Sequence, residues 1–260
     1  MIGNITPVLL TYNEAPNIGR GLEKLSWAVD IIIVDSYSQD ETVSIAKKFP
    51  NVRLFQRKFV SHAAQWNFAL KETGINTEWV LALDSDYILT DDFIEELKEL
   101  HPDAETSGYR SHFTYCIMGR PIRASVYPPV TVLYRRQLAA YIQDGHTQRL
   151  TISGRIADLN SAIMHDDRKP LMDWLLSQDR YMKLEADKLS SVNFCDLDWA
   201  DRVRKLRIVS PVAMFFYCLF IKGLVLDGLA GFYYSFQRMM TELILSLHLI
   251  QLDFKKFHKK

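Results

Sequence analysis

Residues 79–86 read WVLALDSD, and this stretch decides the fold class. Its apolar part, residues 79–83, has the length and composition of a buried strand. Asp84, Ser85 and Asp86 follow directly and form a D-x-D motif. Two carboxylates one residue apart can share a divalent cation, and such a hard cation neutralises the charge of a diphosphate. The stretch therefore predicts a buried strand that ends in a metal site.

The position of the D-x-D motif matters more than its spacing. A motif this short occurs by chance about once in a chain of this size. Asp196 and Asp198 repeat the spacing, but no strand pattern precedes them. We expect that second pair to lie in a solvated turn.

Two other apolar runs also end in polar clusters. Residues 5–10 and 31–34 are apolar runs, followed respectively by Thr11, Tyr12, Asn13 and Glu14 and by Asp35, Ser36, Tyr37 and Ser38. In an open parallel sheet the ligand binds outside the carboxyl ends of the strands, so three such clusters would converge on one site. The alternative is that each cluster caps a helix or forms a turn, positions that Asn, Asp and Ser also favour.

Short apolar runs alternate with helical patterns over the first hundred residues. The strand-like runs are residues 5–10, 31–34, 52–55 and 79–83. This order predicts an α/β fold with a parallel sheet and right-handed crossovers. From about residue 108 to residue 165, Tyr, Phe, β-branched residues and Pro predict added, partly antiparallel strands.

The sequence lacks the glycine-rich loops that cradle phosphates. Gly19 and Gly21 lie inside a helical pattern without a third partner, and no G-x-x-x-x-G-K segment occurs. A metal on the D-x-D motif is therefore the expected way to hold a diphosphate. A nucleotidyltransferase on a related sheet has less support, because no glycine-rich loop follows the first strand.

Composition favours a globular protein in a reducing compartment. The chain has 260 residues, 48% of them apolar and 24% charged, which is enough for a large core. Its three cysteines are widely spaced and odd in number, which argues against a disulfide framework. No basic segment precedes the short apolar run at the amino terminus, so we expect no secretory signal and a cytoplasmic location.

The C-terminal region is both basic and apolar. Residues 201–260 hold ten Lys and Arg against four Asp and Glu, a net charge of +6, which leaves residues 1–200 at −6. Basic clusters on either side of apolar surface suit an anionic membrane better than a nucleic acid. Residues 208–226 are long enough to span a bilayer, but Pro211 and Lys222 make them a poor span. We expect helices that lie in the membrane interface; plain core packing or a homo-oligomer contact is the alternative.

Several segments together resemble a known family. LTYNEAPNI, IIIVDSYSQDET, AAQWNFAL and LALDSD resemble the nucleotide-sugar half of a family 2 glycosyltransferase of the GT-A fold, a Rossmann-like, mostly parallel sheet flanked by helices. GHTQRL, MHDDRKPL, WLLSQDRYMKLEADKL and LDGLAGFYYSFQR resemble its bacterial branch with lipopolysaccharide-core β-glucosyltransferases. The resemblance covers most of the chain. It implies a glycosyltransferase domain over residues 1–200, with its nucleotide-sugar half at 1–107 and its acceptor half at 108–200, before a membrane-associating region at 201–260.

The same resemblance implies an activity and partners. The enzyme would be an inverting, metal-dependent hexosyltransferase on the inner face of the bacterial cytoplasmic membrane. It would move a sugar from a nucleotide-sugar donor, expected to be a UDP-sugar, to a lipid-linked, lipopolysaccharide or polysaccharide acceptor. The alternative is a non-catalytic binding or assembly module on the same fold at the membrane surface.

The resemblance also implies roles for individual residues. Contacts with the nucleotide-sugar would come from Thr11, Tyr12, Glu14, Asp35, Gln65, Asn67, Asp84 and Ser85. Asp84 and Asp86 would bind Mg²⁺ or Mn²⁺, with His165 as a further ligand or phosphate contact.

The catalytic base is where the sequence departs from the family pattern. The lipopolysaccharide-core branch often carries Glu directly after a His in the acceptor loop, but here His146 is followed by Thr147. Inverting transfer needs a general base that deprotonates the acceptor hydroxyl. Asp144 is the nearest carboxylate and the expected base, with His146 as second candidate or positioning partner. The alternative is that Asp144 and Gly145 only form a turn.

Overall fold

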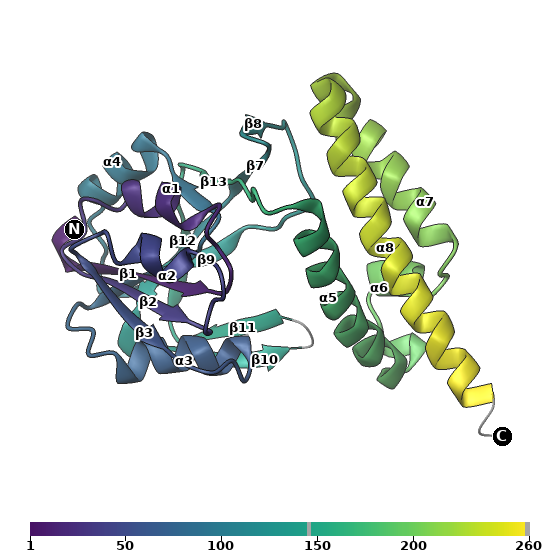
Figure 1. The fold of residues 1–260 in the computed structure, drawn as a ribbon, viewed down its shortest axis with the longest axis horizontal. Coiled ribbons are helices and arrows are strands. Elements are labelled where there is room, and N and C mark those ends of the chain that lie inside the picture. Colours follow the sequence, from purple (N-terminus) through teal and green to yellow (C-terminus); the bar gives the residue numbers. More distant parts are fainter. Residues whose placement is uncertain (145–146, 258–260) are drawn as a thin grey trace. The chain divides into compact units, whose positions relative to one another are not determined.

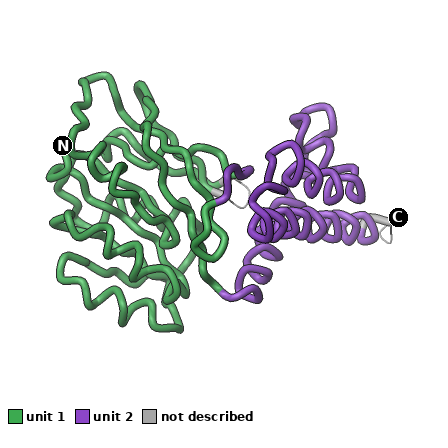
Figure 2. Tube along the Cα trace, turned by 90° about the horizontal axis from the view of Figure 1, so that it is seen from above, with its two compact units in different colours: residues 1–121, 127–169 green, residues 122–126, 170–260 purple. Residues whose placement is uncertain are grey.

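The chain forms two compact units, which we describe separately (Figure 2). The computed structural model describes residues 1–144 and 147–257. Unit 1 comprises Met1–Pro121 and Tyr127–Lys169, and unit 2 comprises Ile122–Val126 and Pro170–Lys260. Unit 2 includes the helix that follows Pro170, because this helix packs with the C-terminal helix.

Unit 1 is built on a seven-stranded sheet in the order β12-β6-β9-β4-β1-β2-β3 (Figure 1). The strands are β1 Ile5–Thr11, β2 Ile31–Asp35, β3 Val52–Gln56, β4 Trp79–Asp84, β6 Thr106–Ser111, β9 Val130–Arg135 and β12 Arg155–Asp158. Strand β9 runs antiparallel to both of its neighbours, and the other pairs in the sheet are parallel. The predicted α/β class with a mostly parallel sheet is confirmed.

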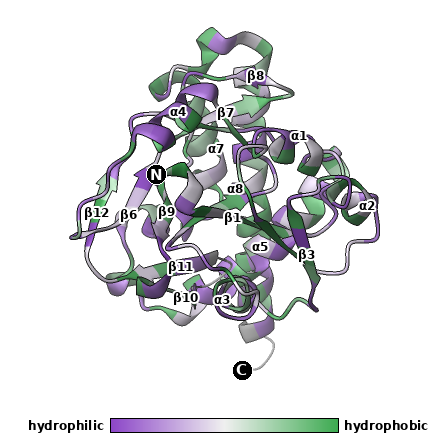
Figure 3. Ribbon diagram, turned by 90° about the vertical axis from the view of Figure 1, so that its left-hand side faces the viewer, coloured by the Kyte–Doolittle hydropathy of each residue, from purple (hydrophilic) through white to green (hydrophobic). Residues whose placement is uncertain are grey.

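The strands bury both faces of this sheet. In β2, Ile31 and Ile33 belong to one core cluster, whereas Ile32 and Val34 belong to the other. This alternation follows from the two-residue repeat of a strand, and it explains why β2 is a continuous apolar run in a sheet whose hydropathy is coloured in Figure 3.

The helices of unit 1 differ in how they begin, and α3 and α4 start after a capping side chain. They are α1 Ile18–Glu23, α2 Thr42–Ala46, α3 His62–Glu72 and α4 Asp91–Glu99. Ser61 caps α3 by accepting from the amide of Ala64, and Thr90 caps α4 in the same way through Phe93. Helices α1 and α4 contribute to the first core cluster and α3 to the second.

Two smaller sheets complete unit 1. One has the order β5-β13-β7-β8, with β5 Tyr87–Leu89, β7 Phe113–Ile117, β8 Arg120–Pro121 and β13 Ile163–His165. The other pairs β10 Ala139–Asp144 with β11 Thr147–Ile152. Short 3-10 turns lie at Ile2–Asn4 and Arg136–Leu138. The predicted added strands after residue 108 are confirmed.

Unit 2 consists of helices around a small core of its own. Its elements are α5 Leu171–Ser191, η3 Phe194–Asp196, α6 Trp199–Arg204, α7 Val209–Phe216, η4 Tyr217–Ile221, η5 Leu224–Asp227 and α8 Gly228–Phe257. Met182 and Leu189 of α5 pack with Leu245 and Leu249 of α8. Within the same unit, buried Glu242 of α8 accepts from Arg204 Nε at 3.2 Å and from Ser210 Oγ at 2.6 Å.

The apolar segment at 208–226 is not one continuous helix. Helix α7 passes into the π-helical turn η4, and Gly223 then adopts a left-handed backbone with φ +71°. No described helix is by itself long and apolar enough to cross a bilayer; the pair Val209–Ile221 and Leu224–Lys255, bent by 72°, would qualify on length and composition alone. The bend is tight, because a Cβ on Gly231 would lie 1.8 Å from the carbonyl oxygen of Leu224.

Candidate active site

The carboxyl ends of the first four strands lie next to one another in register. Thr11 of β1 pairs with Asp35 of β2, and Asp35 pairs with Gln56 of β3. On the other side of β1, Leu10 pairs with Asp84 of β4. The polar clusters that follow these strands are therefore brought to one edge of the sheet, as the sequence predicted.

Asp35 organises the loops after β1 and β2. Its carboxylate is completely buried and accepts hydrogen bonds from Thr11 Oγ1 and from the Ser38 amide, both at 3.0 Å. Gln65 of α3 joins the same region, since its Nε2 donates to Ser36 Oγ at 2.9 Å. Thr11, Asp35 and Gln65 are thus close together, with Asp35 in the role of an internal acceptor.

Two residues in these loops have left-handed backbone. Asn13 has φ +53° and Tyr37 has φ +62°. Asn tolerates this region, but for Tyr it is unusual and is found mainly where surrounding contacts enforce it. Tyr12 and Tyr37 leave about half of their side chains exposed, at 46% and 49%. Both rings belong to the loops after β1 and β2 and provide flat faces on which a planar base could stack.

The D-x-D motif lies beside His165 of β13. His165 Nε2 is 3.0 Å from Asp86 Oδ2. The other ring nitrogen, Nδ1, is buried, and no described residue offers it a hydrogen-bond partner. Ser85 turns back toward β1, where its Oγ donates to the Leu10 carbonyl at 3.2 Å. Asp86 and His165 are therefore in contact, Asp84 ends β4 two residues before Asp86, and the Ser85 hydroxyl is used inside the fold.

The carboxylates of this cluster repel each other. Burial raises the pKa of Asp84 to about 6, and the Asp86 carboxylate adds to the shift. Burial would also raise the pKa of Asp86, but His165 and Lys169 lower it below its usual value. Burial would lower the pKa of His165, yet Asp86 and Asp84 raise it above its usual value. The cluster carries excess negative charge that a bound cation would relieve.

The chemistry of these side chains suits a divalent cation. Two carboxylates and an imidazole are ligands that Mn²⁺ accepts, and carboxylates alone suit Mg²⁺. Within residues 1–144 and 147–257, however, no group of three His, Cys, Asp or Glu side chains is arranged so that it could hold a metal ion. The fit to a cation therefore lies in the chemistry of these donors and not in their arrangement.

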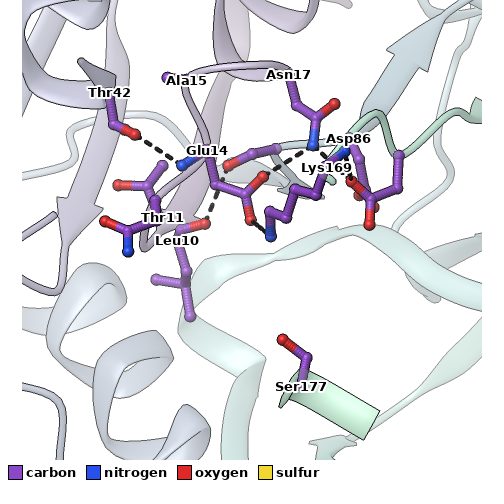
Figure 4. A network of polar contacts seen from close by, with 12 residues as sticks. Leu10, Thr11, Glu14, Ala15, Asn17, Thr42, Asp86, Lys169 and Ser177 are labelled. Carbon is purple, nitrogen blue, oxygen red and sulfur yellow. Dashed lines mark hydrogen bonds and ion pairs between the residues drawn. The ribbon is translucent and has the colours of Figure 1, made fainter. Parts of the chain in front are cut away.

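A lysine reaches this cluster from beyond β13. Lys169 forms an ion pair with Glu14, which follows β1 (Figure 4). Burial raises the pKa of Glu14 to about 7, with Lys169 opposing and Asp86 adding to the shift. Burial would lower the pKa of Lys169, but Glu14, Asp167 and Asp86 together raise it. Lys169 thus places a permanent positive charge next to the carboxylates.

Asn17 links the segment that carries Lys169 to the loop after β1 by hydrogen bonds. Asn17 is completely buried, and its Nδ2 donates to Glu14 Oε2 at 3.0 Å and to Asp167 Oδ1 at 2.9 Å (Figure 4). Its Oδ1 accepts from Arg20 at 2.7 Å and from the Arg168 amide at 2.9 Å. All four hydrogen-bonding positions of the side chain are therefore used in joining two distant segments.

A buried aspartate strengthens the same junction. Asp166 accepts from Arg20 Nη1 at 2.6 Å and from the Gly119 amide at 3.0 Å. Burial would raise the pKa of Asp166, but its hydrogen bonds and the arginines lower it below the usual value. The segment after β13 is thereby tied to α1 and to the β7–β8 turn.

The remaining predicted residues lie around α3 and the β10–β11 hairpin. Asn67 uses its amide to hold β10, accepting from the Tyr141 amide at 3.0 Å and donating to the Tyr141 carbonyl at 2.8 Å. Asp144 is the last residue of β10, and His146 lies outside the described residues. The side-chain positions of the two candidate bases relative to the acidic cluster therefore lie outside the described structure.

Sequence reasoning left Asn17, Tyr37 and Lys169 without a role at the site. Asn17 and Lys169 stand in the quoted segments LTYNEAPNI and MHDDRKPL, which meet through the bond from the Arg168 amide to Asn17, 151 positions apart, and no local pattern reveals this. Tyr37 belongs to the polar cluster after the second strand. A bulky residue within a turn-forming run was the signal that could have identified it.

Comparison with known proteins extends these observations. An uncharacterized glycosyltransferase of Rickettsia felis is 22% identical over 88% of this chain and 83% of that protein. The lipopolysaccharide core biosynthesis glycosyltransferase LpsC of Rhizobium meliloti is 23% identical over 88% of this chain and 85% of that protein.

The fold is also similar to a solved structure. S. aureus TarS 1–349 in complex with UDP-GlcNAc superposes with a TM-score of 0.50 over 97% of this chain and 91% of that one, at 14% identity. The sheet order and this likeness identify the GT-A fold predicted from the sequence. The family model of glycosyl transferase family 2 matches residues 7–155, more than half of the chain, including most of β1 and all of β2, β3 and β4. The chain therefore belongs to glycosyl transferase family 2, and the protein is a glycosyltransferase.

Proposed function

We propose that this glycosyltransferase is an inverting hexosyltransferase that uses a UDP-sugar and a divalent metal. The observation that carries the proposal is the meeting of Asp84, Asp86 and His165 with the permanent cation Lys169 at the carboxyl edge of the sheet. The UDP-sugar is suggested by TarS, whose structure holds UDP-GlcNAc. A lipid-linked or lipopolysaccharide acceptor is suggested by LpsC, a lipopolysaccharide core enzyme. With these proposed substrates, the protein would act at the inner face of the bacterial cytoplasmic membrane.

The base of the nucleotide is expected against the loops after β1 and β2. Tyr12 and Tyr37 offer exposed rings for stacking, and Thr11 and Asp35 fix the loops that carry them. Glu14 and Gln65 lie at the same edge and can meet the base or the ribose. Because Asp35 is buried and already accepts several hydrogen bonds, its main contribution is to shape this surface.

The diphosphate is expected beside the acidic cluster. Asp84, Asp86 and His165 are the residues that would hold Mg²⁺ or Mn²⁺. When bound, the metal would stabilise the negative charge that develops on the departing diphosphate. Lys169 adds a fixed positive charge of the protein itself, and its ion pair with Glu14 holds the ammonium group in place.

The acceptor hydroxyl requires a base, for which Asp144 remains our proposal and His146 the second candidate. Asp144 ends β10, the strand that Asn67 ties to α3. Tyr141 of the same strand stacks on Trp66 with ring centroids 5.3 Å apart. A carboxylate at the end of a strand held in this way can take the proton of the acceptor as the sugar transfers.

A screen of nucleotide sugars by thermal shift with Mn²⁺ tests the donor, and release of UDP tests the chemistry. A matching donor at about 100 times its Kd stabilises the folded state by roughly 2.7 kcal/mol. We expect UDP-sugars to give this shift with Mn²⁺, and a supplied acceptor to accelerate UDP release. Donor binding without any hydrolysis or transfer would instead favour the non-catalytic module.

Replacing Asn17 with alanine is expected to weaken donor binding more than it weakens the fold. The change leaves Glu14, Asp167 and Arg168 with unmet hydrogen bonds, at a typical cost of about 1–3 kcal/mol. It also frees the segment that carries Lys169, so the Kd for donor measured by calorimetry should rise about tenfold or more.

The matched control is Asn51→Ala. Asn51 lies in the same unit and donates to the Ala28 carbonyl at 2.8 Å, with no role at the site. Equal stability losses in the two variants, with donor affinity unchanged in both, would contradict a positioning role for Asn17.

A further inference from the structure

Helix α8 carries an apolar stripe that no other part of its unit covers. Its large apolar side chains recur every three or four positions from Leu229 to Leu247 and again at Phe254, and each is 37% exposed or more: Leu229, Phe232, Phe236, Met240, Leu243, Leu247 and Phe254. The stripe extends over 26 residues, and its ends are about 38 Å apart at 1.5 Å per residue. The other side of the helix contributes buried residues such as Tyr234, Leu245 and Leu249 to unit 2.

A second stripe on α7 and η4 joins the first. Its members are Val209, Val212, Phe216 and Phe220, each at least 51% exposed. A chain of ring contacts connects the stripes: Phe236 to Phe215 at 4.9 Å, Phe215 to Phe216 at 5.5 Å, and Phe216 to Phe220 at 5.9 Å. Helices α7 and α8 lie side by side in this unit (Figure 1). We call the two stripes together the α7–α8 apolar face.

The charges of these helices leave a positive excess. Asp227, Glu242 and Asp253 are each held in an ion pair, with Arg123, Arg204 and Arg207 respectively. By contrast, within the described chain no ion pair involves Lys222, two residues after Phe220, or Lys255, directly after Phe254. Residues of the α7–α8 apolar face carry no charge. An apolar surface with unpaired lysines at the ends of its stripes is complementary to an anionic lipid surface.

We propose that the α7–α8 apolar face embeds in the headgroup region of an anionic bilayer, with α8 lying in the membrane plane. A spanning helix would have to be apolar on all sides, whereas the inner side of α8 carries Ser235, Thr241 and Glu242, which are buried within unit 2. One apolar stripe opposite a polar, packed side is the pattern of an interfacial helix. This inference deepens the proposed function, because it names the surface at which the protein would meet a lipid-linked acceptor. Only the identity of the acceptor rests on the proposed function.

Binding of the full chain to vesicles tests the proposal. We expect sedimentation with phosphatidylethanolamine–phosphatidylglycerol vesicles, and weaker sedimentation with phosphatidylcholine vesicles or at high salt. Leu229→Glu with Leu247→Glu places two charges on the stripe and should lower partitioning by roughly tenfold or more. Val29→Glu with Ile156→Glu adds the same charge at exposed apolar positions of unit 1 and should leave partitioning unchanged.

The uncharged pair Leu229→Gln and Leu247→Gln covers the case in which the glutamate variant fails to fold, as judged by circular dichroism. If folded stripe variants and the control pair bind vesicles alike, the proposal is overturned. It is also overturned if ultracentrifugation shows a dimer that the stripe variants dissociate while vesicle binding persists, since the face would then be covered by a second copy.

The orientation of α8 is tested by measuring how deeply its two ends lie in the bilayer. Dyes on Leu229→Cys and on Phe254→Cys, in a Cys195→Ser background, should be quenched alike by lipids brominated near the headgroup. Depths that differ by the roughly 30 Å of a bilayer core would show a spanning helix and overturn the in-plane arrangement. These measurements use no donor, and the Asp86→Asn protein should bind vesicles normally, so loss of activity and loss of membrane binding can be distinguished.

Discussion

Asp86→Asn is expected to abolish sugar transfer while leaving the fold intact. Asparagine keeps the size of the side chain and its hydrogen bond to His165, but removes the charge that the metal requires. Groups that stabilise charge in a transition state typically contribute 10²–10³-fold, so turnover should fall by about 10³-fold. The measurements are turnover with the donor found by screening, and the affinity for Mn²⁺ by calorimetry.

The chain contains a matched control for this variant. Asp198 belongs to the second D-x-D pair, and its carboxylate accepts from the Asp201 amide at 2.8 Å as the cap of α6. Asn is an equally good cap, so Asp198→Asn should keep both stability and turnover. Full turnover of Asp86→Asn, or of the unaltered protein in excess chelator, would refute the metal role.

Asp144→Asn is expected to slow turnover by roughly 10² or more with little change in donor affinity. The substitution removes the base and preserves the shape of the side chain. Asn67 and Trp66 hold β10 through Tyr141, so the strand should keep its position. Single-turnover rates and the Kd for donor, measured on the same preparation, separate the chemical step from binding.

Two further variants decide how the base is assigned. His146→Ala should cause an intermediate loss if the histidine only positions the carboxylate. Asp158→Asn removes an exposed carboxylate from β12 of the same unit, where it pairs with Arg110, and should leave turnover unchanged. Normal turnover of Asp144→Asn together with an inactive His146→Ala would transfer the role of base to His146.

The sheet could be predicted because its strands are buried on both sides. Continuous apolar runs at 31–34 and 79–83 predict strands buried on both faces. The polar residues directly after them indicate the edge of the sheet where ligands bind. The position of Asp84 and Asp86 relative to the sheet follows from that local pattern alone.

The pairings that complete the site could not be predicted, because they join residues far apart in the chain. Nothing near Asn17 indicates that its amide meets Asp167, and nothing near Lys169 indicates Glu14. The same holds for Asn67, whose partner is a backbone group of β10. The sequence shows that such a polar residue needs a hydrogen-bond partner, but it does not identify the partner.

In unit 2 the pattern was visible in the sequence, but its meaning was ambiguous. Its apolar periodicity was visible in the sequence, yet the same pattern suits a core, a dimer or a membrane. Gly223 and the close contact of Gly231 with Leu224 break the apolar segment into two helices. Helix α5 packs with α8 because both present apolar residues to each other, which places the compact unit boundary before Leu171.

The distance along the chain between Glu14 and Lys169 has a consequence during synthesis. The two residues are 155 positions apart. At about 5–20 residues per second, a ribosome needs roughly 8–30 s to travel from one to the other. While residues 87–164 are being added, the nascent chain holds Asp84 and Asp86 but lacks His165 and Lys169. The nascent chain therefore contains the carboxylates of Asp84 and Asp86 before it contains the Lys169 ammonium group that balances them. We expect donor binding to appear only after Lys169 has been synthesised.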